Sequence, residues 1–170
     1  MTRDDRGNFV DSEGVATEPH KIVVKDARQL LPKNRMNLTR NGFELLENTV
    51  PSYDFLDHQE VITRYYRDCE DIVAEATGGK VWAFDHNIRS AGGLAEKRRV
   101  KGGQDVQGPA HIVHGDYTLR SARDRLTQLT EASSVNDTLR QVVPEGQGLI
   151  PKDAANPALN DGGRFAIINV

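Results

Sequence analysis

The sequence predicts an α+β fold for this 170-residue chain, and two kinds of periodicity support that prediction. Over residues 57–77 apolar side chains recur at steps of three and four, as on one face of an amphipathic helix. Stretches such as 80–86 and 164–170 instead alternate, or are rich in β-branched and aromatic residues, as strands are. With 37% hydrophobic and 28% charged residues, the chain is long enough and apolar enough to build a core.

The elements follow in order along the chain. Residues 1–19 are polar and charged and are expected to be a flexible N-terminal arm, whereas 20–170 are expected to form one domain. Strands are predicted at 20–25, 42–46, 80–86, 110–116 and 164–170. Helices are predicted at 57–77, which ends at Gly78 and Gly79, and over TLRSARDRLTQL, capped by Thr118 or Ser121, with a further short helix over 135–143. Residues 146–163 are rich in proline and glycine and are predicted to be a loop.

Composition excludes several classes of function. The net charge of −3 argues against a partner such as nucleic acid, and the one basic run, 97–101, is best interpreted as a solvated loop and less well as an anion site. A single cysteine, Cys69, excludes an intramolecular disulfide and a thiolate metal cluster, and it lies on the apolar stripe of the predicted helix. The chain shows no secretory signal and no apolar run of membrane-spanning length, so we expect a cytoplasmic protein without a membrane partner.

The segment PAHIVHGDYT (109–118) contains the best candidate for a metal site. In a strand, His114 and Asp116 would lie on one face and could converge on one ion, whereas His111 would point to the other face. A histidine and a carboxylate completed by a second histidine form the facial triad of non-haem Fe(II) oxygenases, although Zn(II), Ni(II) and Mn(II) accept the same donors. His58 and Glu60 repeat the spacing at the start of a predicted helix, where the two side chains diverge. The alternative for His114 and Asp116 is a hydrogen-bonded polar pair.

Three further residues are candidates for binding a substrate or co-substrate. His86 and Arg89 lie where a predicted strand enters a loop, and a guanidinium binds carboxylates through two parallel hydrogen bonds. An ion pair between Arg89 and Asp85 is an equally good interpretation. Tyr117 follows the candidate metal pair and would either line a pocket or pack at the end of the strand.

Several separated motifs, in order, resemble the AsaB-like and CmcJ/NvfI-like hydroxylase/desaturase family of secondary metabolism, which is related to Fe(II)- and 2-oxoglutarate-dependent oxygenases. The matching segments are GFELL (42–46), PSYDFLDHQEVITRYYRDCEDIV (51–73), FDHNIR (84–89), PAHIVHGDYT (109–118) with RSARDRL (120–126), and RFAIINV (164–170). The resemblance extends from about His20 onward and implies a double-stranded β-helix (jelly-roll) core with flanking helices. Arg125 matches an arginine of the family, but a surface ion pair with Asp124 or Glu131 is the simpler expectation.

The resemblance implies Fe(II) held by His114, Asp116 and a distal histidine, with 2-oxoglutarate as co-substrate, and hydroxylation or desaturation of a small-molecule substrate. In such relatives the RFAIINV strand continues into further strands that supply the distal histidine. No histidine follows His114 here, so we expect a chain shortened at its C-terminus, an incomplete barrel and a third ligand from elsewhere.

Two other hypotheses stay open. The chain could be a catalytically inactive, truncated relative that acts as a binding or assembly module, with the exposed C-terminal strand 164–170 recruiting a second copy to form a homo-oligomer. A metal-dependent hydrolase built on His114 and Asp116 is a weaker hypothesis, because the sequence offers no second ligand cluster.

Overall fold

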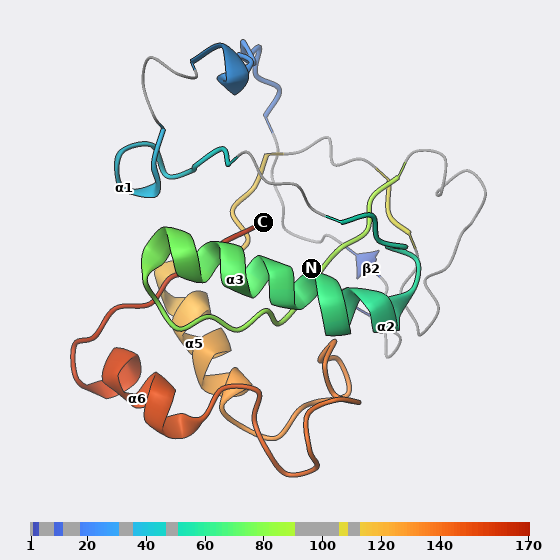
Figure 1. Ribbon diagram of the computed structural model, residues 1–170, viewed down its shortest axis with the longest axis vertical. Helices are drawn as coiled ribbons and strands as arrows, with labels where there is room; N and C mark the ends of the chain where they lie inside the picture. The colour runs from blue at the N-terminus through green and yellow to red at the C-terminus, as the bar shows by residue number, and fades with distance from the viewer. Residues whose placement is uncertain are drawn as a thin grey trace. The chain divides into compact units, whose positions relative to one another are not determined.

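The computed structural model describes residues 2–3, 9–11, 18–30, 36–46, 51–90, 106–108 and 113–170 (Figure 1). Its strands are β1 (Thr2–Arg3) and β2 (Phe9–Asp11), and its helices are η1 (Ala27–Leu30), α1 (Leu38–Asn41), α2 (His58–Glu60), η2 (Val61–Tyr65), α3 (Tyr66–Thr77), α5 (Leu119–Leu129) and α6 (Lys152–Asn160). The chain divides into two compact units, Gly14–Ser52 and the remainder, Met1–Glu13 with Tyr53–Val170. None of the described helices is long and apolar enough to cross a bilayer.

In the unit Gly14–Ser52, the described residues form two short helices. Asn37 caps α1 by accepting a hydrogen bond from the Arg40 backbone N–H at 2.8 Å, and Gly42 ends the helix in the left-handed conformation. The predicted strands at 20–25 and 42–46 are not formed. The apolar run from Ile22 to Val24 is exposed, and it pairs with no other strand among the residues that the structure describes.

Strand pairing is sparse among the described residues. Strands β1 and β2 form an antiparallel pair, with Thr2 opposite Asp11 and Arg3 opposite Phe9. A single parallel bridge joins Arg89 to Gln107. The predicted strands at 80–86 and 164–170, and the described part of 110–116, have no regular secondary structure. The jelly-roll core therefore stays a prediction.

The helix predicted at 57–77 is confirmed as the continuous run α2, η2 and α3. Asp57 caps its start by accepting from the N–H groups of Gln59 and Glu60, and Gly78 ends it with φ 68°. The π-helical turn η2 was not predicted. Residues five apart lie about 140° apart around an α-helix, but a π turn brings them to one side, so Val61 and Tyr66 are both buried.

Two small clusters of buried side chains form the core of the larger unit. The first contains Val61, Tyr66 and Leu139, and the second contains Leu129, Ile150 and Ala155. Residues 82–84 run between them in the alternating manner predicted from the sequence. Ala83 packs on the first cluster, and Trp82 and Phe84 pack on the second. The Ala83 N–H donates to the Glu70 carboxylate at 2.8 Å, so a side chain of α3 fixes this segment.

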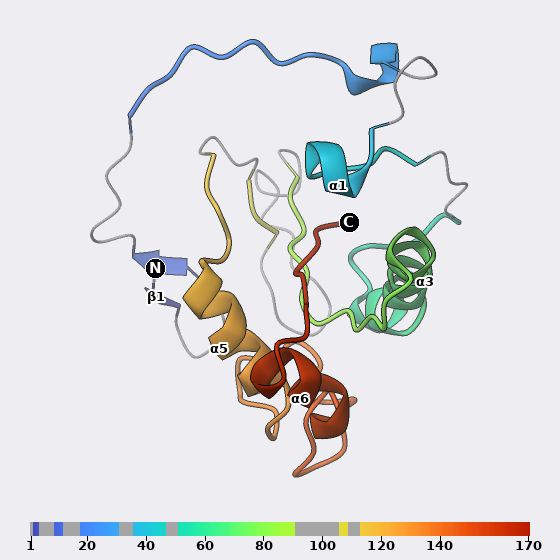
Figure 2. The ribbon, with the colours of Figure 1, turned by 90° about the vertical axis from the view of Figure 1, so that its left-hand side faces the viewer.

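The predicted start of α5 at Thr118 is confirmed, because Thr118 and Ser121 form a reciprocal capping box. The prediction of a loop throughout 146–163 is wrong, because Lys152–Asn160 forms α6, which lies against α5 (Figure 2). Pro157 removes one N–H from this helix, but Ala155 is buried and the Ile150 N–H donates to Leu129 O at 2.9 Å. Tertiary packing therefore outweighs the local penalty. Residues 135–143, predicted as a short helix, form turns.

Candidate functional site

His114 and Asp116 lie side by side in the described structure. The distance from His114 Nε2 to Asp116 Oδ1 is 3.3 Å, and their side chains are 41% and 50% exposed. The backbone bends at Asp116, two residues before the cap of α5, and the segment 113–118 carries no strand hydrogen bonds. A bend, and not the alternation of a strand, is what brings the two side chains together here.

The separation between these two atoms fits a shared metal ion. Ligands at about 2.0–2.2 Å from one ion, with about 90–109° between them, lie about 2.8–3.6 Å apart. The measured 3.3 Å falls inside that range, and both side chains are open to solvent. A hydrogen-bonded polar pair satisfies the same distance. Among the described residues no three His, Cys, Asp or Glu side chains gather closely enough to hold a metal, so the described site supplies two donors.

Asn169 also contacts the pair, and sequence reasoning missed it. Its Nδ2 donates to Asp116 Oδ2 at 3.1 Å, across 53 residues of sequence. No local pattern could predict this contact, since neither the spacing nor the residue type of Asn169 is distinctive. The one signal in the sequence is that the segments 164–170 and 109–118 both match motifs of the family that the chain resembles.

A second polar cluster surrounds His86. The hydroxyl group of buried Tyr66 lies 2.8 Å from His86 Nδ1, and the His58 ring lies 5.7 Å from the His86 ring, with 33° between their planes. Burial, followed by the neighbouring His58, lowers the pKa of His86, so the ring is neutral at pH 7. Burial also raises the pKa of Tyr66, so its hydroxyl group stays protonated. The two neutral groups share one hydrogen bond, in which either the Tyr66 O–H or the His86 Nδ1–H is the donor according to the tautomer of the ring.

Tyr117 lies close to charges of both signs. Burial raises the pKa of Tyr117, the nearby Arg125 opposes that increase, and the carboxylates of Asp85 and Asp116 add to it. Tyr117 is 37% exposed, so it is neither fully packed nor free in solvent. The structure thus places Tyr117 within electrostatic range of Asp116 and of the residue that precedes His86.

The structure also shows the partners of Arg89 and Arg125. Arg89 Nη1 donates to Gly108 O at 3.2 Å, whereas Asp85 accepts from Thr138 Oγ1 at 2.6 Å, so these two described residues do not form the ion pair considered above. Arg125 was expected to pair with Asp124 or Glu131, and this is wrong.

Arg125 Nη2 pairs with Asp137 Oδ1 at 2.9 Å, and its guanidinium lies over the Phe84 ring. Burial alone would raise the pKa of Asp137, but the Ser134 N–H and Arg125 outweigh it and hold that pKa below its usual value. This partly buried pair fixes α5 to the turn region that follows it. Arg125 is therefore a structural residue, and its family match implies no contact with a substrate.

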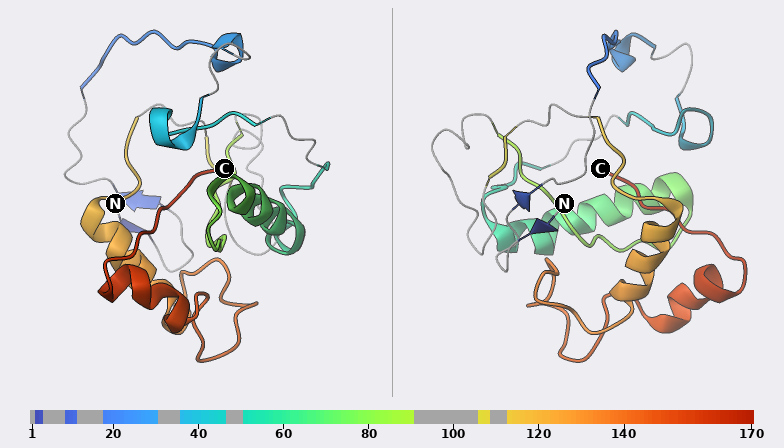
Figure 3. Two further views of the ribbon diagram at one scale, coloured as in Figure 1. Left: turned by 60° about the vertical axis from the view of Figure 1, so that its left-hand side comes forward. Right: turned by 180° about the vertical axis from the view of Figure 1, so that it is seen from behind.

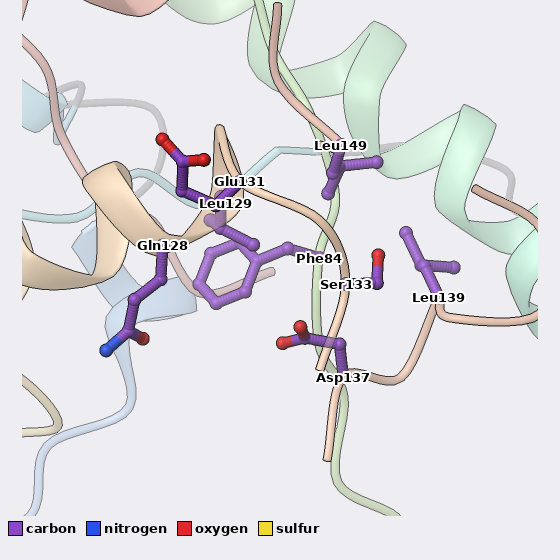
Figure 4. A pocket seen from close by; sticks show the side chains of 8 residues that line it. All are labelled: Phe84, Gln128, Leu129, Glu131, Ser133, Asp137, Leu139 and Leu149. Carbon is purple, nitrogen blue, oxygen red and sulfur yellow. The ribbon is translucent and has the colours of Figure 1, made fainter. Parts of the chain in front are cut away.

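A small hollow beside this ion pair is not a substrate pocket. The Phe84 ring faces into it, and the other side chains that line it come from 128–149 (Figure 4). Its volume is about 10 Å³, which is room for about one water molecule. None of the five candidate residues, His86, Arg89, His114, Asp116 and Tyr117, lines this hollow.

Comparison with known proteins identifies the family. Residues 2–144 match the model of the oxidoreductase/YMDC permease-like domain. The chain is 39% identical to an uncharacterized protein of the dcmA 3′ region of Methylophilus leisingeri, over 99% of this chain and 77% of the relative. It is 35% identical to oxidoreductase AN1597 of Emericella nidulans, over 61% of this chain and 35% of that protein. No solved structure matches the chain. The chain therefore belongs to the oxidoreductase/YMDC permease-like domain family.

Proposed function

We propose that this chain is a non-haem Fe(II) oxidoreductase that uses 2-oxoglutarate as co-substrate and hydroxylates or desaturates a small metabolite. The observation that carries the proposal is the pair His114 and Asp116, whose donor atoms lie 3.3 Å apart. Membership in the family and the similarity to the Emericella nidulans oxidoreductase support an oxidoreductase in general. The resemblance to AsaB-like and CmcJ/NvfI-like hydroxylases supports the narrower class.

In this proposal the pair supplies two ligands with complementary chemistry. Neutral imidazole of His114 gives a nitrogen donor through Nε2, and ionised Asp116 gives an oxygen donor through Oδ1. Bound Fe(II), with O2 as the oxidant and 2-oxoglutarate as the co-reductant that is converted to succinate and CO2, would supply the oxidising chemistry, and the protein's part is to position the substrate. The exposure of both side chains leaves room for a metal and further ligands on their open side.

Three candidate residues have side chains suited to binding an anionic or carbonyl-bearing molecule. Tyr66 contacts Nδ1 of His86, and in the tautomer with the proton on Nε2 that N–H is a donor for a ligand. Arg89 uses Nη1 for Gly108 O, and a guanidinium has further N–H groups that can bind a carboxylate. Tyr117 would border the same region as Asp116, to whose charge it responds. We propose that these three residues contact the substrate or the 2-oxoglutarate carboxylate.

The third ligand is the open question in this proposal. It is not among the described residues, and His111 lies outside them. His86 does not gather with His114 and Asp116 in the described structure. Replacement of His111 therefore tests it directly as the third ligand.

The experiment is anaerobic addition of Fe(II) and 2-oxoglutarate to the full chain, followed by the visible charge-transfer band of the complex. We expect the band in the wild-type protein and in the control variant His20→Ala. The exposed ring of His20 pairs with Glu18, and both residues are far from His114 in the sequence. We expect no band in His114→Ala or Asp116→Ala. A wild-type protein without the band, or a band that survives both substitutions, would refute the proposal.

A second candidate is a non-catalytic binding or assembly module. It is favoured by one observation, namely that the described residues supply two metal donors and no third. In that case the segment 164–170 would contact a second copy of the chain, and size-exclusion chromatography would show a concentration-dependent dimer. A monomer at high concentration that also shows the charge-transfer band would exclude this candidate.

A further inference from the structure

We propose that Asn169 is a positioning residue for the Asp116 carboxylate, which it holds as a ligand that uses a single oxygen. This inference rests on the proposed function, because it assigns the contact a role in metal binding. Asn169 Nδ2 lies 3.1 Å from Asp116 Oδ2, while Asp116 Oδ1 faces His114 Nε2 at 3.3 Å. The two oxygens of one carboxylate are thus committed to different partners.

The chemistry of the contact fixes its direction. An ionised carboxylate only accepts hydrogen bonds, so the amide nitrogen of Asn169, and not its oxygen, must face Asp116. With Oδ2 held in this way, rotation of the carboxylate is restricted and Oδ1 stays directed toward His114. A ligand that binds through both oxygens would have to give up the Asn169 hydrogen bond. Asn169 therefore favours a metal that takes one oxygen from Asp116.

The fold explains why Asn169 can reach Asp116. The chain leaves α6 through Gly162, which has φ 70°, and Gly163, whose N–H donates to Pro157 O at 2.8 Å. A Cβ on Gly163 would lie 2.7 Å from Pro157 O, so glycine is required for this close reversal. The right-hand view of Figure 3 shows the segment 164–170 running from α6 back toward the start of α5.

Both sides of the contact are anchored to the same pair of helices. Asp116 is two residues before Thr118, which caps α5. Helix α6 is fixed to α5 by the hydrogen bond from Arg123 to Leu159 O, and by the Ile150 N–H bond to Leu129 O. The Asn169 contact therefore links the segment that follows α6 to the segment that precedes α5. Hydrogen bonds of this kind around metal ligands typically account for about 10–100-fold in metal affinity.

The test measures Co(II) affinity of the full chain by titration calorimetry and by the visible spectrum of the bound ion, since Co(II) accepts the same donors. We expect Asn169→Ala to weaken binding about 10–100-fold and to shift the spectrum. The matched control is Asn160→Ala, because Asn160 is also exposed but contacts Asn156 instead. That control should bind Co(II) as the wild-type protein does.

Urea unfolding without metal separates positioning from a general effect on folding. Asn169→Ala should unfold at about the same urea midpoint as Asn160→Ala and yet bind Co(II) more weakly, whereas a structural defect would lower both the midpoint and the affinity. Wild-type affinity in Asn169→Ala, together with loss of binding in His114→Ala, would overturn the positioning role and leave the proposed function standing. A wild-type protein that binds no Co(II) or Fe(II) would overturn the proposed function and this inference with it.

Discussion

Removal of the Tyr66 hydroxyl group, by Tyr66→Phe, changes one hydrogen bond in the core of the larger unit. The ring of Tyr66 packs with Val61 and Leu139, and phenylalanine keeps that packing. What is lost is the hydrogen bond between the hydroxyl group and His86 Nδ1, which lies 2.8 Å away. The half-buried His86 would then carry a ring nitrogen that has lost this partner.

The magnitude follows from the burial of the two partners. A fully buried donor or acceptor that loses its partner costs about 1–3 kcal/mol. Water can reach part of the His86 ring, so the lower half of that range applies, and we expect the free energy of unfolding to fall by about 1–1.5 kcal/mol. For a chain of this length that corresponds to a melting temperature lower by about 2–6 °C.

Urea unfolding followed by tryptophan fluorescence measures this change. The chain has one tryptophan, Trp82, which packs on the Leu129 cluster and so reports on the larger unit. The matched control is Tyr65→Phe on the same helix, where the hydroxyl interacts with the Cys69 thiol, a weak hydrogen-bonding group. That control should cost about 0–0.5 kcal/mol. Equal losses in the two variants, or no loss in Tyr66→Phe, would refute a stabilising hydrogen bond between Tyr66 and His86.

Three further predictions concern stability. Burial lowers the pKa of His86 below 6.5 in the folded chain, so the unfolded chain binds more protons at acidic pH. The contribution of His86 to the free energy of unfolding should therefore be complete above about pH 6.5 and should decrease as the pH falls below that value. If His86→Gln showed the same dependence of stability on pH as the wild-type protein, this prediction would be contradicted. Arg125→Ala breaks a partly buried ion pair and should lower the free energy of unfolding by about 1.5–3 kcal/mol. The control Arg120→Ala breaks an exposed ion pair and should lower it by about 0–1 kcal/mol, so equal losses in the two variants would contradict the prediction. Gly163→Ala forces a Cβ against Pro157 O and should cost about 1–3 kcal/mol, whereas an unchanged urea midpoint would show that the turn relaxes freely.

Local signals in the sequence predicted two helical segments correctly, 57–77 and the helix that begins at Thr118, but not α6 or the turns at 135–143. The run over 57–77 and the cap at Thr118 depend on residues within one or two turns of each other, such as Asp57 with the N–H groups that follow it. The helix α6 was missed because Pro157 argues locally against a helix, while the buried Ala155 and the contacts with α5 that stabilise it come from elsewhere in the fold. The π turn likewise depends on both Val61 and Tyr66 being buried, which periodicity alone does not require.

The candidate site shows the same division between short and long range. His114 and Asp116 are two residues apart, so a local bend of the backbone is enough to bring their side chains together, and their proximity does not depend on the predicted strand. Asn169 reaches them only because α5, α6 and the glycine turn bring residue 169 back to residue 116. A third metal ligand is a long-range feature of this second kind. Variants that remove individual histidines can therefore identify it, whereas the spacing of histidines along the sequence cannot.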